Sequence, residues 1–113
     1  KNGFESWEIE FFFNTPQYDP AILIPKKSTS DITKGHLDTL AKMLEILSEE
    51  KWTAEGIKNA LWGYATENGK GEVLAPMRIA LSGRLSSPDP FSIATAVGKQ
   101  ITLLRLIHAK DSL

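Results

Sequence analysis

The apolar positions of this 113-residue chain recur at helical spacing. In the clearest run, Leu37, Leu40, Leu44 and Leu47 follow one another at intervals of three or four residues, and charged residues occupy the opposite side. That arrangement is typical of an amphipathic helix with one buried face. Residues 28–31 offer Ser, Thr and Asp side chains as N-caps before this run, which ends near residue 50. The pattern therefore predicts one long helix in the first half of the chain.

Weaker stripes predict further helices, and no segment alternates in the manner of a strand. Met77 and Trp62 lie within these stripes and are predicted to be core residues. In the helix predicted from about residue 72 to 82, Pro76 is expected in the first turn, where its missing N–H does no harm. Three other helices are predicted over residues 4–13, 20–24 and 53–68, the last of them closed by the glycines at 69 and 71. A further helix is predicted from Pro88 or Pro90 to residue 97. The last helix is predicted from residue 99 to the end, with an apolar stripe of Ile101, Leu104 and Ile107. The expected fold is all-α, a multihelical bundle of about six short helices.

Composition narrows the class of protein. The chain is 42% hydrophobic, enough for one compact core. It has no cysteine, which excludes disulfides, thiolate metal sites and a cysteine nucleophile. No apolar run approaches the roughly 20 residues that span a bilayer, so no membrane association is expected. The first residue is Lys1 rather than methionine, which suggests a piece of a longer polypeptide.

The charges are unevenly distributed along the chain. The net charge is −1, yet residues 69–110 hold six basic residues against two acidic ones. All three arginines, Arg78, Arg84 and Arg105, lie in that block. Segregated positive charge is a weak indication of polyanion binding at this size, and on charge alone an ordinary solvated face is the more frequent explanation.

Catalytic and metal-binding patterns are absent from the sequence. His36 and His108 have no partners at ligand-like spacing, and neither a GxxxxGK[ST] nor a GxGxxG segment occurs. We therefore expect no catalytic residue, no metal ligand and no cofactor in this chain.

The arginines and the loop after them are the candidate chemistry. Arg78 stands four residues after Leu74 and three before Leu81, beside the apolar stripe, so its fork can project past the core rim. A structural salt bridge or cap interaction is an equally good interpretation of that spacing. The loop of residues 82–90 holds Arg84 and leads into a helix N-terminus, a favourable place for an anion. Phe91 is expected in the core, with stacking on an unpaired base as the alternative.

Five segments in order resemble motifs of one family, the bacterial-type glutamyl-tRNA synthetases. Residues 71–83, GEVLAPMRIALSG, resemble the family's G-x-[VL]-x-x-P-[LM]-R-x-A-[LV]-[TS]-G segment. Residues 87–91 resemble its [ST]-P-x-x-F element, and 97–99 its [LV]-G-[KR]. Upstream, residues 11–19 resemble F-F-F-x-x-x-x-Y-D, and 52–57 resemble W-[TN]-x-x-x-[IL]. Each match alone is unspecific, but five in family order across almost the whole chain are quite specific.

The resemblance implies the carboxy-terminal, α-helical anticodon-binding region of such a synthetase. Residues 1–27 would end the preceding helical subdomain or connector, and residues 28–113 would form the C-terminal subdomain. The parent enzyme attaches glutamate to tRNA(Glu) with ATP, and the domain that uses ATP and Mg²⁺ would lie N-terminal to this region. This chain would then bind the anticodon loop, without catalysis, as part of a cytoplasmic, monomeric enzyme.

The resemblance also implies which residues contact RNA. In the family, the arginine after P-[LM] and the [ST]-P loop contact anticodon bases. Carried over, this indicates Arg78, Ser87 and Pro88, with Phe91 shaping the loop. The predicted RNA-binding residues are these four together with Arg84 and Asp89. The chain departs from the family at Asp89 and Pro90, where glycine and an apolar residue are frequent. Asp89 brings negative charge toward the RNA, or instead caps the helix that begins at Pro90.

Two alternatives from other classes remain open at the level of sequence. The helices on either side of residues 82–90 could be mistaken for a helix-turn-helix of a DNA-binding domain, but residues 91–97 carry no Arg, Lys, Asn or Gln to read bases. A helical protein-interaction domain, with structural arginines, is the other alternative.

Overall fold

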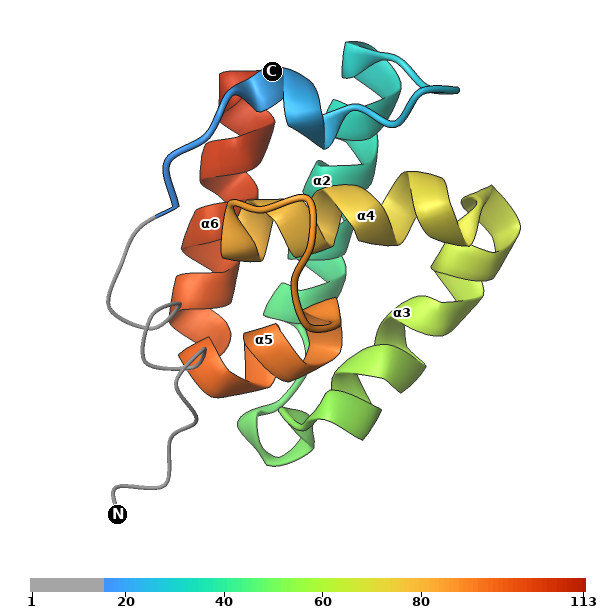
Figure 1. Cartoon of the computed structure of the whole chain (residues 1–113). Helices are drawn as coiled ribbons and strands as arrows, with labels where there is room; N and C mark the ends of the chain where they lie inside the picture. The colour runs from blue at the N-terminus through green and yellow to red at the C-terminus, as the bar shows by residue number, and fades with distance from the viewer. Residues whose placement is uncertain (1–15) are drawn as a thin grey trace.

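The computed structural model describes residues 16–113, and this part of the chain is all-helical. The described part contains five α-helices and two short 3₁₀ helices and no strand, which confirms the all-α class. Figure 1 shows their arrangement. The elements are η1 (Pro20–Leu23), α2 (Ser30–Glu45), η2 (Glu49–Lys51), α3 (Ala54–Asn68), α4 (Lys70–Ser82), α5 (Pro90–Val97) and α6 (Lys99–Ser112). The helix predicted over residues 4–13 lies outside the described residues.

Polar side chains fix where several of these helices begin. The Thr29 hydroxyl accepts a hydrogen bond from the backbone N–H of Ile32 (3.2 Å) at the start of α2. Thr53 accepts one from the N–H of Gly56 (3.0 Å) at the start of α3. Such caps satisfy N–H groups that have no partner within the first turn. The predicted starts of α2 and α3 are therefore confirmed.

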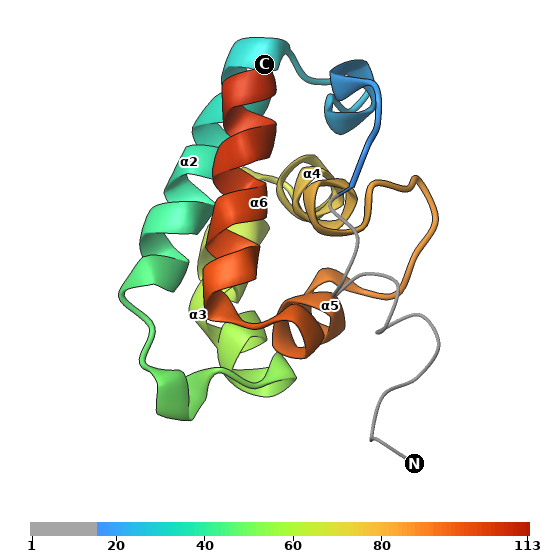
Figure 2. The same ribbon diagram turned by 90° about the vertical axis from the view of Figure 1, so that its left-hand side faces the viewer.

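Helices α2 and α6 run antiparallel, side by side, and α4 crosses them (Figures 1 and 2). The Ser30 hydroxyl at the start of α2 donates to the carbonyl of Leu113 at the end of the chain (3.3 Å). Lower down, the Lys110 ammonium lies 3.3 Å from the Asp38 carboxylate. These contacts join segments about 80 residues apart in the sequence. The apolar faces of the helices meet in one core. Fully buried side chains come from every α-helix and from η1: Leu23, Leu37, Leu40, Leu44, Ile57, Leu61, Met77, Leu81, Ile93 and Leu106.

Helix α4 differs from its prediction, because it begins at Lys70 and encloses Pro76. Gly69, at a φ of 95°, ends α3 and is itself the residue before α4. Its carbonyl accepts from the N–H of Val73 (3.0 Å), so the chain turns from one helix to the next within a single residue. Pro76 is therefore interior and buried, not in the first turn. It has no N–H to offer the carbonyl of Glu72, so one bond of the helical ladder is missing at mid-helix.

Two other predictions about helix faces were wrong. Trp62 is 37% exposed rather than a core residue. In α6, Leu104 is 67% and Ile107 42% exposed, whereas Arg105 is 7% exposed. The buried face of α6 is displaced from the predicted stripe because a charged residue of that helix has partners in the interior, as described below. The helix predicted to end near residue 50 ends at Glu45 and is followed by η2.

Candidate nucleic-acid interface

The loop between α4 and α5 is held in shape at its first residue. Gly83 adopts a left-handed conformation (φ 75°), and its N–H donates to the carbonyl of Ile79 (2.6 Å). A side-chain carbon at this position would lie 2.8 Å from Cβ of Pro16 and would approach the ring of Tyr18. Only glycine combines that φ with so little space. The segment before η1 therefore packs against the start of the loop.

Arg78 ties α4 to the far part of this loop. Its Nη1 donates to the carbonyl of Leu85 (2.8 Å) and to the hydroxyl of Ser87 (3.3 Å). The side chain is half-buried, at the rim where the sequence predicted it. Nε and Nη2 make no hydrogen bond within residues 16–113. The guanidinium thus has a structural role in the loop and still holds donors for a ligand.

Ser87 and Pro88 lie together at the Arg78 guanidinium. The Ser87 hydroxyl accepts from Arg78 and donates to the carbonyl of Pro88 (3.0 Å). Both residues are half-buried. The three residues that the family resemblance indicated are therefore one cluster in space, built from the end of α4 and the loop.

Asp89 is the N-cap of α5, as one of the two sequence interpretations held. Its Oδ1 accepts from the backbone N–H of Ser92 (2.9 Å), and its Oδ2 accepts from the Ser92 hydroxyl (2.8 Å). Pro90 occupies the first helical position. The positive end of α5 already faces a carboxylate of the chain itself, which weakens it as a site for an outside anion.

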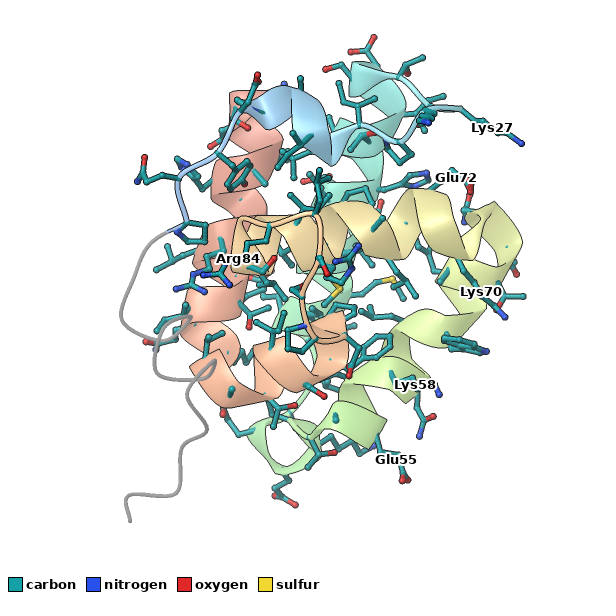
Figure 3. The ribbon with its side chains drawn as sticks, in the orientation of Figure 1. Lys27, Glu55, Lys58, Lys70, Glu72 and Arg84 are labelled. Atoms are coloured by element: carbon teal, nitrogen blue, oxygen red, sulfur yellow. The ribbon has the colours of Figure 1, made fainter. Side chains whose placement is uncertain are left out.

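Phe91 and Arg84 differ in exposure, since Phe91 is buried and Arg84 is exposed. Phe91 is 8% exposed and belongs to the core beneath the loop, so its ring supports the loop and offers no open face for a base. Arg84 is exposed on the outer side of the loop, where Figure 3 labels it, and its N–H donates to the hydroxyl of Ser82 (3.1 Å).

Sequence reasoning missed two residues at this site. Arg105 of α6 donates from Nη1 to the carbonyl of Leu81 (2.8 Å) and so holds the end of α4, from which the loop departs. Burial lowers the pKa of the Arg105 guanidinium. Leu85 is 66% exposed in the loop, next to the Arg78 guanidinium that its carbonyl binds. The arginine cluster of residues 69–110 was a signal for Arg105, but no spacing rule indicates that an arginine is buried.

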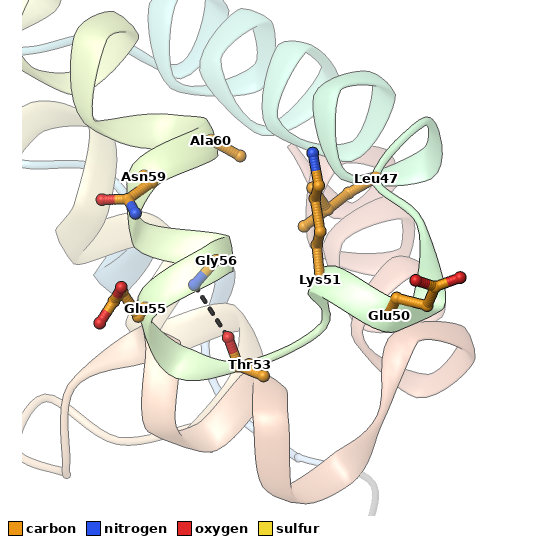
Figure 4. Close-up of a pocket in the computed structure, with 8 residues that line it drawn as sticks. All are labelled: Leu47, Glu50, Lys51, Thr53, Glu55, Gly56, Asn59 and Ala60. Atoms are coloured by element: carbon orange, nitrogen blue, oxygen red, sulfur yellow. Dashed lines mark hydrogen bonds between the residues drawn. The ribbon is translucent and has the colours of Figure 1, made fainter.

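A groove of about 760 Å³ lies elsewhere, between the end of α2 and the start of α3 (Figure 4). Two carboxylates and one lysine line it, and none of the predicted site residues does. Its lining consists of Leu47, Glu50, Lys51, Thr53, Glu55, Gly56, Asn59 and Ala60. Within residues 16–113 there is no cluster of three His, Asp or Glu side chains able to hold a metal ion. In the same part of the chain, no helix has both the length and the apolar character for a membrane span.

Comparison with known proteins identifies the kind of domain to which the chain is similar. The family model described as "Anticodon binding domain" matches residues 7–110. The chain is 35% identical over 108 residues to the glutamate–tRNA ligase of Herpetosiphon aurantiacus, covering 93% of this chain and 21% of that protein. It is 32% identical over 108 residues to that of Solibacter usitatus (92% and 22%) and 37% identical over 102 residues to that of Clostridium kluyveri (87% and 21%).

The matches extend over nearly the whole chain but only a limited part of each relative. The chain spans about a fifth of the length of these curated ligases. The family model alone includes all of α2 to α5, the Arg78 cluster and most of α6. The chain therefore belongs to the anticodon binding domain family, and the curated relatives that it matches are glutamate–tRNA ligases.

Proposed function

We propose that this chain binds the anticodon loop of tRNA(Glu) as the C-terminal part of a glutamate–tRNA ligase. The parent enzyme would join glutamate to that tRNA with ATP, and ATP and Mg²⁺ would act in a catalytic domain outside this chain. The parent would work as a cytoplasmic monomer. The observation that carries the proposal is the Arg78 cluster, in which a guanidinium with spare donors is fixed against a proline-containing loop.

The geometry suits the recognition of unstacked bases. Anticodon bases are single-stranded, so a protein can hydrogen-bond their edges. The bonds from Nη1 to Leu85 and Ser87 hold the guanidinium plane in place, so that little side-chain entropy is lost when Nε and Nη2 bind a base edge or a phosphate. Pro88 restricts the backbone of the loop, so that little backbone entropy is lost when the loop binds a base. The exposed side chain of Leu85 offers an apolar surface beside that fork.

Replacing Arg78 tests the proposal. We expect Arg78→Ala to weaken binding of a tRNA(Glu) anticodon stem-loop about tenfold or more, because bidentate base contacts are worth roughly 1–3 kcal/mol. Arg78→Lys should keep the charge but lose most of the preference for the cognate anticodon. The measurement is a low-salt titration with the cognate stem-loop and with one of altered anticodon, and circular dichroism checks the helices.

An unchanged affinity of Arg78→Ala would contradict this assignment of Arg78. Duplex DNA in a gel-shift assay tests the alternative class, and we expect it to bind no better than a stem-loop of altered anticodon. The exposed face of α5 contains Thr95, and that helix has no basic or amide side chain to enter a groove.

A further inference from the structure

The corner between α3 and α4 carries an exposed tryptophan with two lysines at its ring. The Lys58 ammonium lies 4.8 Å and the Lys70 ammonium 4.5 Å from the centroid of the Trp62 ring. We call these three residues the corner cluster. Figure 3 labels both lysines at the edge of the molecule away from Arg84. The cluster is thus separate from the loop site described above.

The tryptophan ring holds two positive charges close together. Because both ammonium groups lie near one centroid, they are at most 9.3 Å apart. A contact of this kind is weak at an exposed site, so that it restricts a flexible lysine without neutralising its charge. Lys70 reaches the ring only because Gly69 turns the chain within one residue. The fold therefore brings together charges that repel one another.

The lysines of the corner cluster form no ion pair within residues 16–113. Within residues 16–113, no carboxylate lies within 4.0 Å of either ammonium, since the two ion pairs found there both involve Asp38. Glu72, the acidic residue nearest to Lys70 in α4, has its carboxylate near Gly69, and its charge acts on His36. Both lysines thus keep donors and charge for an external anion.

We propose that the corner cluster binds the phosphate backbone of the same RNA, and this inference rests on the proposed function. Two close, unpaired ammonium groups suit a polyanion better than an apolar partner. Lys70 and Arg78 lie eight residues apart on α4, about 12 Å along the helix axis. A few nucleotides cover that distance. The cluster would position the RNA without reading its sequence, whereas Arg78 reads bases.

The double variant Lys58→Ala/Lys70→Ala tests this proposal through the salt dependence of binding. Each phosphate contact on a single strand contributes about 0.7 to the slope of log K against log salt. Losing two should reduce the slope by about 1.4, so that the loss of affinity between 50 and 200 mM salt shrinks about sevenfold. We expect the same change with the cognate stem-loop and with the stem-loop of altered anticodon.

The matched control is Lys34→Ala/Lys42→Ala, which removes two exposed lysines from α2. Figure 2 shows α2 on the side of the bundle away from the α4–α5 loop, so the control should leave the slope unchanged. Trp62→Phe should keep the slope, because it keeps a ring for the lysines, and Trp62→Ala should lose part of it. The indole N–H resonance of Trp62, identified by its absence in Trp62→Phe, should shift when the stem-loop is added.

The outcomes separate this proposal from the proposed function. An unchanged slope in Lys58→Ala/Lys70→Ala, together with anticodon-dependent binding by the unmodified chain, would overturn the corner cluster alone. An equal loss of slope in Lys34→Ala/Lys42→Ala would also overturn the corner cluster, since removing any two lysines would then have the same effect. If the unmodified chain does not distinguish the two stem-loops, the proposed function fails. A reduced salt slope in Lys58→Ala/Lys70→Ala would then still show that the corner cluster contacts phosphate.

Discussion

The two ends of α4 carry positive charge in different ways. Near the C-terminal end, Arg78 is half-buried and anchored to the loop through hydrogen bonds from one nitrogen. At the N-terminal end, Lys70 is exposed and is restrained by an aromatic ring. A fixed planar fork can select among bases, whereas a lysine is a mobile point charge suited to phosphate. We therefore expect one helix to support two kinds of RNA contact.

Two glycines, one near each end of α4, differ in whether the structure leaves room for a side chain. Gly83 needs a left-handed conformation and has Pro16 close by, while a side-chain carbon at Gly71 would meet nothing within 4 Å. A side chain should therefore be poorly tolerated at Gly83 and well tolerated at Gly71, whereas Gly69, directly before α4, shares the strict requirement of Gly83 because its φ is 95° and a side-chain carbon there would lie close to the Glu72 carboxylate. Three further substitutions, taken from the largest expected effect to the smallest, test this contrast.

Gly83→Ala should have the largest effect. A left-handed alanine costs about 1–2 kcal/mol, and the approach to Pro16 adds to it. We expect a loss of about 2 kcal/mol in the free energy of unfolding, or roughly 10 °C in Tm, with weaker anticodon binding. Gly71→Ala is the control and should leave stability equal or raise it by up to about 1 kcal/mol. Equal losses of stability in Gly83→Ala and Gly71→Ala, measured by thermal melts, would contradict the difference between the two glycines.

Asp89→Ala should have a smaller effect on stability and an opposite effect on binding. Losing the N-cap of α5 costs about 1 kcal/mol. RNA affinity should rise, because a negative charge is removed beside the Arg78 cluster. Asp89→Ser separates the two effects, since a serine can cap without the charge. Thr53→Ala removes the cap of α3 and should match the stability loss without tighter binding. Unchanged affinity in both Asp89 variants would show that the carboxylate does not face the RNA.

The smallest expected effect is a pH dependence of stability that arises from His36, a buried residue near Glu72. Burial lowers the pKa of His36 below 6.5, and the Glu72 charge partly offsets this. Nδ1 of His36 lies 2.6 Å from the Tyr64 hydroxyl. The unfolded chain takes up this proton first, so the contribution of His36 to stability is complete above pH 6.5 and is lost as the pH falls toward the lower folded value.

Melts at pH 7.5 and 5.5 check this expectation. The decrease in Tm between them should be smaller in His36→Gln than in the unmodified chain. His108 is exposed, so His108→Gln should behave like the unmodified chain. Identical decreases in all three proteins would remove the role of His36.

Local patterns predicted much of the fold. Thr53 and Asp89 each begin a helix as expected, because capping depends on a side chain and on N–H groups two or three residues away. The family motifs placed Arg78, Ser87 and Pro88 in one site before any contact was known, and the fold brings them together. That these residues bind RNA stays a prediction.

Patterns failed where the answer depended on distant segments. Trp62 fits an apolar stripe, yet within residues 16–113 it stays 37% exposed, and the lysines at positions 58 and 70 approach its ring instead. Pro76 was placed in a first turn, because nothing local shows that α4 begins immediately after Gly69. A helical stripe gives the direction of a face but not what lies against it.

The sequence by itself determined the helical class, several helix starts and the family. The helical class and the helix starts follow from residue types within a few positions of one another, and the family follows from five short motifs in order along the chain. Only the tertiary structure decided that Arg105 is buried at the end of α4 and that Lys58 and Lys70 share one ring. A guanidinium can be buried only where carbonyls such as that of Leu81 are offered to it, and that depends on how whole helices pack.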